Sequence, residues 1–272
     1  MTAPAPRIDE RAPLPPGERA PLPPGERAPL VEVFASIQGE GAYVGEPQTF
    51  VRLAVCPLRC RYCDSESTWE ATDTWLVARA DGEVERRPNP ADVKATLDAI
   101  ASAEGGAPRT VSITGGEPLA HPEFVAELAR ELRAQGRRVH LETAGVHAGA
   151  LAGVLPAVDH VSADLKLRST METGDFFDSH RRFLAACASA HVDTCVKCVV
   201  TPKVADEEMD EAASLVASVD PDLLFVVQPA TPMRLEPSAI SNERVDALVA
   251  RARRRLRRVR VIPQVHRAMG RS

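Results

Sequence analysis

The sequence predicts an α/β fold, in the form of a partial, open TIM-like barrel, on three observations. Beyond residue 30, short runs rich in β-branched residues alternate with longer amphipathic stretches, which is the pattern of βα units on a largely parallel sheet. The alternation repeats about six times, which fits an open (β/α)6 barrel better than a closed eightfold one. Chemically distinctive residues follow the ends of successive apolar runs, and a barrel of this kind gathers those ends at one mouth.

Each short apolar run is interpreted as a strand, and each amphipathic stretch between two runs as a helix. The first helix has Asn89 as a candidate cap, and Gly136 ends the second. The predicted strands cover residues 49–55, 110–114, 138–142, 158–165, 193–200, 223–228 and 259–263. The predicted helices cover residues 90–104, 122–135, 176–190, 206–219 and 242–256.

Two segments depart from this alternation. Residues 69–88 place apolar and charged side chains alternately around Asp81-Gly82, which predicts an inserted hairpin or irregular excursion. Residues 12–19 and 20–27 repeat the sequence Ala-Pro-Leu-Pro-Pro-Gly-Glu-Arg. Because proline at this density opposes both helix and sheet, residues 1–29 are predicted to be a disordered or polyproline-II tail. Residues 30–272 are then expected to form one catalytic domain.

Composition narrows the classes of partner and compartment. The chain of 272 residues is 44% hydrophobic and 26% charged, with a formal net charge of -5. This charge gives no reason to expect nucleic acid or an anionic membrane, so a small molecule is the expected partner. The sequence shows no apolar run of membrane-spanning length and no secretory signal, which predicts a cytoplasmic protein. In a reducing compartment, the six cysteines are expected to be thiols and metal ligands.

Three of those cysteines, Cys56, Cys60 and Cys63, follow the first predicted strand with the spacing C-x3-C-x2-C. Three thiolates can hold three irons of a cubane cluster and leave the fourth iron open, whereas a closed iron–sulfur or zinc site needs four ligands. An open iron can bind S-adenosylmethionine (SAM), and an electron from the reduced cluster can then cleave the sulfonium to yield a 5′-deoxyadenosyl radical. The spacing alone also permits a zinc site or, in a secreted protein, disulfides.

A second motif, Thr114-Gly115-Gly116-Glu117-Pro118, follows the next strand. Consecutive glycines allow a ligand to approach the backbone closely, although a Gly-Gly pair alone is usually only a turn. The cysteine triad followed one βα unit later by this motif resembles the radical SAM superfamily. The resemblance implies a [4Fe-4S] cluster at the three cysteines and SAM as the cofactor.

The segment 34–45, which contains Ser36-Ile37-Gln38-Gly39-Glu40-Gly41, identifies a narrower resemblance. Followed by Phe50-Val51-Arg52-Leu53, Cys63-Asp64-Ser65 and Trp69, it resembles the 7-carboxy-7-deazaguanine synthase (QueE) family, from about Val31 to Met269. The resemblance implies a radical SAM lyase that contracts 6-carboxy-5,6,7,8-tetrahydropterin to 7-carboxy-7-deazaguanine with loss of ammonia. It also implies Mg²⁺, an electron donor such as flavodoxin or ferredoxin, and a homodimer.

The resemblance assigns roles to individual residues, with the radical rather than a side chain as the reactive species. Ser65 would bind Mg²⁺, although the family usually has threonine there. The substrate would contact Ile37, Gln38, Gly39, Glu40, Arg52 and Thr114. SAM would contact Tyr62, Cys63, Asp64, Gly116, Glu142, Ser162, Ala163, Asp164, Lys166, Gln228, Pro229, Ala230 and Thr231. Many family members have Ser-Pro-Lys where this chain has Ser162-Ala-Asp-Leu-Lys166, which leaves the register of the lysine open.

Other features are given structural interpretations. Cys195 and Cys198 are three apart on a strand, so they are predicted to point to opposite faces as buried thiols. The arginines between 251 and 260 are predicted to form a solvated face, and His266 is a weak candidate for closing over the substrate. Two alternatives stay open: a glycyl-radical activase, which would not need the Gln38-Gly39-Glu40 segment, and a non-catalytic iron–sulfur or zinc module, which would need a fourth ligand.

Overall fold

A computed structural model describes residues 27–106 and 110–270 of the chain. Within this part, ten strands form one sheet in the order β12-β11-β10-β9-β8-β7-β3-β2-β4-β5. In this order, the neighbouring strands from β12 across to β3 all pair in parallel, and they form the predicted open barrel. They are β3 (Pro47–Leu53), β7 (Thr110–Gly115), β8 (Val139–Thr143), β9 (His160–Asp164), β10 (Asp193–Val200), β11 (Leu224–Pro229) and β12 (Val259–Val261).

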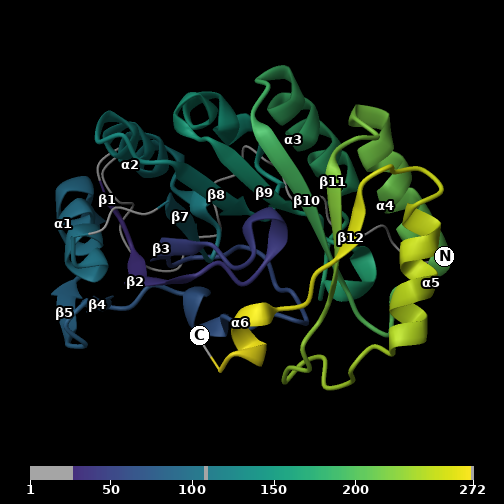
Figure 1. Ribbon diagram of the computed structural model, residues 1–272, viewed down its shortest axis with the longest axis horizontal. Helices are drawn as coiled ribbons and strands as arrows, with labels where there is room; N and C mark the ends of the chain where they lie inside the picture. The colour runs from purple at the N-terminus through teal and green to yellow at the C-terminus, as the bar shows by residue number, and fades with distance from the viewer. Residues whose placement is uncertain (1–26, 107–109, 271–272) are drawn as a thin grey trace.

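The helices cover the outer face of this sheet as an arc, and the long apolar core lies between the two layers (Figure 1). Strands β8 and β9 are linked by short 3-10 turns, whereas each other connection between neighbouring strands from β3 to β12 contains a helix. The helices are α1 (Val93–Glu104), α2 (Pro122–Ala134), α3 (Phe177–Ser189), α4 (Asp206–Val219) and α5 (Asn242–Ala252).

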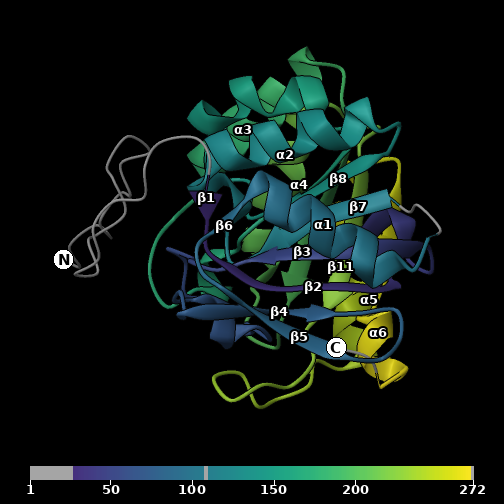
Figure 2. The ribbon, with the colours of Figure 1, turned by 90° about the vertical axis from the view of Figure 1, so that its left-hand side faces the viewer.

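Strand β2 (Leu30–Ile37) extends the parallel sheet on one side and pairs antiparallel with β3. Its other neighbour is β4 (Thr74–Ala78), which forms an antiparallel hairpin with β5 (Val84–Pro88). The hairpin predicted within residues 69–88 is therefore present, and Figure 2 shows it beside β2, away from α2 and α3. Strand β2 was absent from the predicted set.

Two predicted boundaries are wrong near the start of the domain. Asp92, rather than Asn89, caps α1, because its Oδ1 accepts a hydrogen bond from the Ala95 amide at 2.7 Å. Asn89 instead hydrogen-bonds the Leu30 backbone from both ends of its side chain. Arg27–Ala28 forms strand β1, which pairs with β6 (Ala91–Asp92), so the ordered domain begins no later than residue 27. The rest of the predicted tail, residues 1–26, lies outside the described residues.

The arginine-rich segment that begins in the last turn of α5 forms ion pairs on the outer surface. Arg251 pairs with Asp206 and Asp210 of α4, and Arg257 pairs with Asp222 at 2.6 Å. Helix α5 ends at Ala252, four residues before the predicted end, and the chain then returns through β12. A four-residue helix that was not predicted, α6 (Val265–Ala268), follows and lies apart from the helical arc (Figure 1). None of the described helices combines the length and apolar character needed to cross a bilayer.

Candidate active site at the barrel mouth

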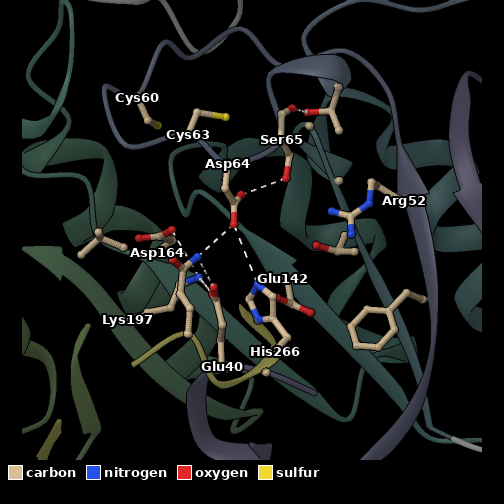
Figure 3. Close-up of a pocket in the computed structure, with 18 of the residues that line it drawn as sticks. Glu40, Arg52, Cys60, Cys63, Asp64, Ser65, Glu142, Asp164, Lys197 and His266 are labelled. Atoms are coloured by element: carbon tan, nitrogen blue, oxygen red, sulfur yellow. Dashed lines mark hydrogen bonds and ion pairs between the residues drawn. The ribbon is translucent and has the colours of Figure 1, made fainter. Parts of the chain in front are cut away.

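A cavity of about 600 Å³ opens where the parallel strands end. The segments that line it include the end of β2, the loop after β3, the ends of β7 to β11 and the segment around α6. The cysteine loop lies at one end of the close-up, and Glu142 and His266 lie toward the other (Figure 3). The fold thus gathers the chemically distinctive residues at one mouth, as the sequence predicts.

Cys56, Cys60 and Cys63 all line this cavity, on one loop between β3 and β4. Arg59 stabilises the loop by donating to the Cys56 carbonyl at 2.7 Å and stacking over Trp69 at 4.7 Å. The other three cysteines, Cys187, Cys195 and Cys198, are buried in the core. The donor set at the cavity is therefore three thiols from one loop, which fits a [4Fe-4S] cluster with one open iron.

The two glycines of the second motif are required by a close approach of two backbones. A Cβ atom on Gly115 would lie 2.2 Å from the Leu53 carbonyl oxygen, and one on Gly116 would lie 2.4 Å from that of Val55. The Gly116 amide donates to Leu53 at 2.9 Å, and the Glu117 amide donates to Val55 at 2.9 Å. The motif thus fixes the cysteine loop against the end of β7, and both glycines line the cavity.

The Glu117 carboxylate is fully buried and connects the ends of β7 and β8. It accepts hydrogen bonds from the Thr143 hydroxyl and the Ala144 amide at 2.7 Å, and from the Leu119 amide at 2.9 Å. We expect Glu117→Gln, which turns one acceptor oxygen into a donor, to lower the free energy of unfolding by about 2–3 kcal/mol. Urea denaturation measures the change. The exposed Glu123→Gln serves as the control, and equal midpoints for the two variants would contradict this role.

The Gln38-Gly39-Glu40 segment forms the wall opposite the cysteine loop. Gln38 is 3% exposed, and its side chain accepts from the Glu40 amide at 3.0 Å while donating to Glu142 at 3.0 Å. The Glu40 carboxylate binds Lys197 and accepts from Gln264 at 2.9 Å. Arg52, whose Nε donates to Glu32 at 2.8 Å, also lines the cavity. Ile37 and Thr114 complete the predicted substrate-binding set along this lining.

Alternating charges connect this wall with the cysteine loop. Lys166 donates to Asp164 at 2.8 Å and to the Tyr62 hydroxyl at 2.9 Å, and Lys197 lies 3.6 Å from Asp164. Burial opposes ionisation of Asp164, but the two lysines outweigh it and lower the pKa of the carboxyl. The lysine whose register the sequence left open, Lys166, therefore faces the cavity.

Two buried polar atoms in the cavity lining have no hydrogen-bond partner within the protein. They are Asp164 Oδ1 and Gln228 Oε1. Because buried polar atoms are normally paired, these two acceptors fit a bound group with N–H or O–H donors, such as SAM. Of the other residues predicted to contact SAM, Ala163 and Pro229 lie outside the cavity lining, and Ala163 packs in the core. The remaining ones line the cavity: Tyr62, Cys63, Asp64, Gly116, Glu142, Ser162, Lys166, Ala230 and Thr231.

Ser65 also lines the cavity, and its hydroxyl donates to Asp64 Oδ1 at 2.9 Å. Asp64 lies close to Glu40 and His266, since one ligand atom from each lies within 4.8 Å of the others. Figure 3 shows these side chains pointing toward one another. The oxygen-rich surroundings of Ser65 suit a hard cation.

The cavity residues that sequence reasoning missed include Lys197, Gln264 and Arg267, which contact its charged groups. Gln264 donates from one amide nitrogen to Glu40 and to Asp64, both at 2.9 Å. Arg267 lies 3.4 Å from Asp64. A helix of four residues has no apolar period, so the sequence offered no pattern that would place this segment over the mouth. For Lys197, the signal in the sequence was the alternation of side-chain direction along β10, which places Lys197 on the face opposite Val196 and Cys198.

The fold and the three-cysteine cavity define a radical SAM protein. The radical SAM superfamily matches residues 51–216, and the chain belongs to that superfamily. It is 35% identical over 248 residues to the 7-carboxy-7-deazaguanine synthase of Geobacter sulfurreducens, covering 89% of this chain and 96% of the relative. The enzyme of the same name from Methanothermobacter thermautotrophicus is 35% identical over 258 residues, covering 89% of this chain and 96% of that relative. Within the superfamily, the chain belongs to the 7-carboxy-7-deazaguanine synthase family.

Solved structures agree with this fold. The crystal structure of QueE from Escherichia coli superposes with a TM-score of 0.59, covering 86% of this chain and 93% of that chain at 23% identity. A His-tagged anSMEcpe structure with bound AdoMet superposes with a TM-score of 0.50 at 14% identity, covering 76% of this chain and 59% of that one. At these identities the likeness shows the shared fold.

Proposed function

We propose that this chain is a radical SAM lyase that converts 6-carboxy-5,6,7,8-tetrahydropterin to 7-carboxy-7-deazaguanine, with loss of ammonia, in the 7-deazapurine (queuosine precursor) pathway. The observation that supports it best is that one cavity holds both the three-cysteine loop and the Gln38-Gly39-Glu40 segment. The names of the full-length relatives support the same reaction. The reaction balances. The bonds from the ring nitrogen N5 to C4a and C6 break, a C4a–C6 bond forms, and N5 leaves as ammonia with its own hydrogen, one hydrogen from C6 and one from C7.

Cys56, Cys60 and Cys63 would hold the [4Fe-4S] cluster, and the cavity wall from Tyr62 to Asp164 would hold SAM. When bound, the reduced cluster and SAM supply a 5′-deoxyadenosyl radical that removes a substrate hydrogen and returns it. The protein's own task is then to orient the pterin against the cofactor and to exclude other reaction partners. No side chain is required as the main catalyst.

The substrate would bind along the opposite wall. Its carboxylate suits the Arg52 guanidinium, and its amide-like edge suits the Glu40 carboxylate and the backbone of residues 37–39. Gln38 would act through its neighbours, because its side chain already binds the Glu40 amide and Glu142. Thr114, at the end of β7, would contact the substrate from the side of the glycine motif.

Ser65 would bind Mg²⁺ together with the substrate carboxylate. Its hydroxyl is a hard oxygen donor, and the adjacent Asp64 carboxylate adds negative charge. Serine supplies the same oxygen as the threonine usual in the family. We also infer a homodimer in the cytoplasm that receives electrons one at a time from flavodoxin or ferredoxin.

The test is an anaerobic assay with the reconstituted protein, SAM, dithionite, Mg²⁺ and 6-carboxytetrahydropterin. We expect 7-carboxy-7-deazaguanine by mass spectrometry, with ammonia in equal amount. SAM cleavage without this product, in protein with intact cluster and magnesium, would contradict the proposed function. Repeating the assay after chelation of Mg²⁺ tests whether turnover needs this ion. We expect a loss of turnover that added Mg²⁺ restores.

A further inference from the structure

Lys197 points into the cavity because of the side-chain alternation along β10. Val196, Cys198 and Val200 pack in the core between sheet and helices, whereas Lys197 and Val199 line the cavity. Only 13% of the Lys197 side chain is exposed. A lysine at such a depth stays charged only where carboxylates compensate for lost hydration.

Three carboxylates act on this ammonium group. Its hydrogen-bond partner is Glu40, Asp164 lies 3.6 Å away, and Glu142 adds a weaker attraction. Burial opposes the charge on Lys197, but these carboxylates outweigh it and raise the pKa of the lysine. Asp164 has a closer cation of its own in Lys166, at 2.8 Å. Glu40 is therefore the main partner of Lys197.

Glu40 depends on Lys197 more than on its other contacts. Gln264 and Gln38 are neutral and supply one hydrogen bond each, to the carboxylate and to the backbone amide. Burial opposes ionisation of Glu40, and Lys197 is the largest of the influences that lower the pKa of this carboxyl. Without Lys197, the buried Glu40 carboxylate would lie near Asp164 with no cation between the two carboxylates.

We propose that Lys197 is a positioning residue for substrate recognition: its ammonium group holds the Glu40 carboxylate in place to receive the amide-like edge of the pterin. This inference rests on the proposed function. The residue acts through Glu40, and Asp164 keeps its closer cation Lys166 at 2.8 Å. We therefore expect the loss of Lys197 to weaken pterin binding and to change the affinity for SAM little.

The test is a double-mutant cycle of Glu40→Gln, Lys197→Met and the double variant, measured by anaerobic calorimetry with 6-carboxytetrahydropterin and, separately, with SAM. We expect each single variant to weaken pterin binding on the order of tenfold to a hundredfold. The double variant should lose no more than Glu40→Gln alone, because the two residues act as one unit. It removes both charges together, so it is expected to fold even if Lys197→Met is unstable.

Lys94→Met is the control, since Lys94 also pairs with a carboxylate but on the surface, with 86% of its side chain exposed. It should bind both ligands as the native protein does. Unchanged pterin affinity in Lys197→Met, additive losses in the cycle, or an equal loss of SAM affinity would overturn the inference. If the native protein makes no 7-carboxy-7-deazaguanine, the proposed function itself fails, which is a separate result.

Discussion

Cys60→Ala is expected to abolish 7-carboxy-7-deazaguanine formation and reductive SAM cleavage together. Cys60 is the most buried of the three cavity cysteines, at 8% exposure, and its backbone bridges to Met171. Alanine removes one of three thiolates, and no other described cysteine faces the cavity to replace it. Iron and sulfide content after reconstitution, the visible absorbance of the cluster and the yield of 5′-deoxyadenosine measure the loss.

Cys187→Ala is the matched control for this change. Cys187 is 1% exposed and lies in the core on α3, so its thiol packs as a small apolar group. The control should keep the cluster and the full reaction while losing on the order of 1 kcal/mol of stability. A Cys60→Ala protein that still turned over the pterin at the native rate would disprove both the cluster assignment and the radical mechanism.

The parallel sheet could be predicted because its strands are short β-branched runs and most of them are followed by an amphipathic stretch. Strand β2 was missed because it does not belong to a βα unit: it pairs antiparallel with β3 and extends the sheet sideways. The cap was wrongly predicted at Asn89 because a tertiary contact overrides the local preference. Asn89 and Asp92 are both good capping residues, and the tertiary contact of Asn89 with Leu30 decides between them.

The site residues that belong to local sequence motifs could be predicted, whereas those that only the fold brings to the cavity could not. Cys195 and Cys198 were correctly predicted to lie on opposite faces, and the same period of two places Lys197 on the Cys195 face, inside the barrel. To predict Lys197 as a site residue, one must also know that this face of β10 borders the cavity. Gln264 and His266 reach Gly39 and Glu40 from more than 200 positions away, a contact that no local pattern encodes.

Gly39→Ala is expected to lower turnover about a hundredfold, because Gly39 contacts α6 from the other end of the domain. Gly39 has no left-handed backbone conformation, so alanine brings no backbone strain of its own. Its Cβ, however, would lie 2.1 Å from Nδ1 and 2.7 Å from Cβ of His266. The clash includes the base of the side chain, so α6 must move and the Val265 amide loses the Gly39 carbonyl, its acceptor at 3.0 Å.

Displacing this segment opens the pterin side of the cavity while the cysteine loop keeps its own contacts with Trp69 and Met171. A displacement of about 1 Å at a reacting centre is enough for a hundredfold loss of rate. Cluster content should stay native, and SAM affinity should fall less than pterin affinity, because the displaced segment also contacts Asp64. SAM cleavage should become uncoupled from product, as measured by the ratio of 5′-deoxyadenosine to 7-carboxy-7-deazaguanine. Gly149→Ala, at a glycine with no atom within 4 Å of the added Cβ, should retain the native ratio. Native turnover in Gly39→Ala would mean that α6 does not help to hold the substrate.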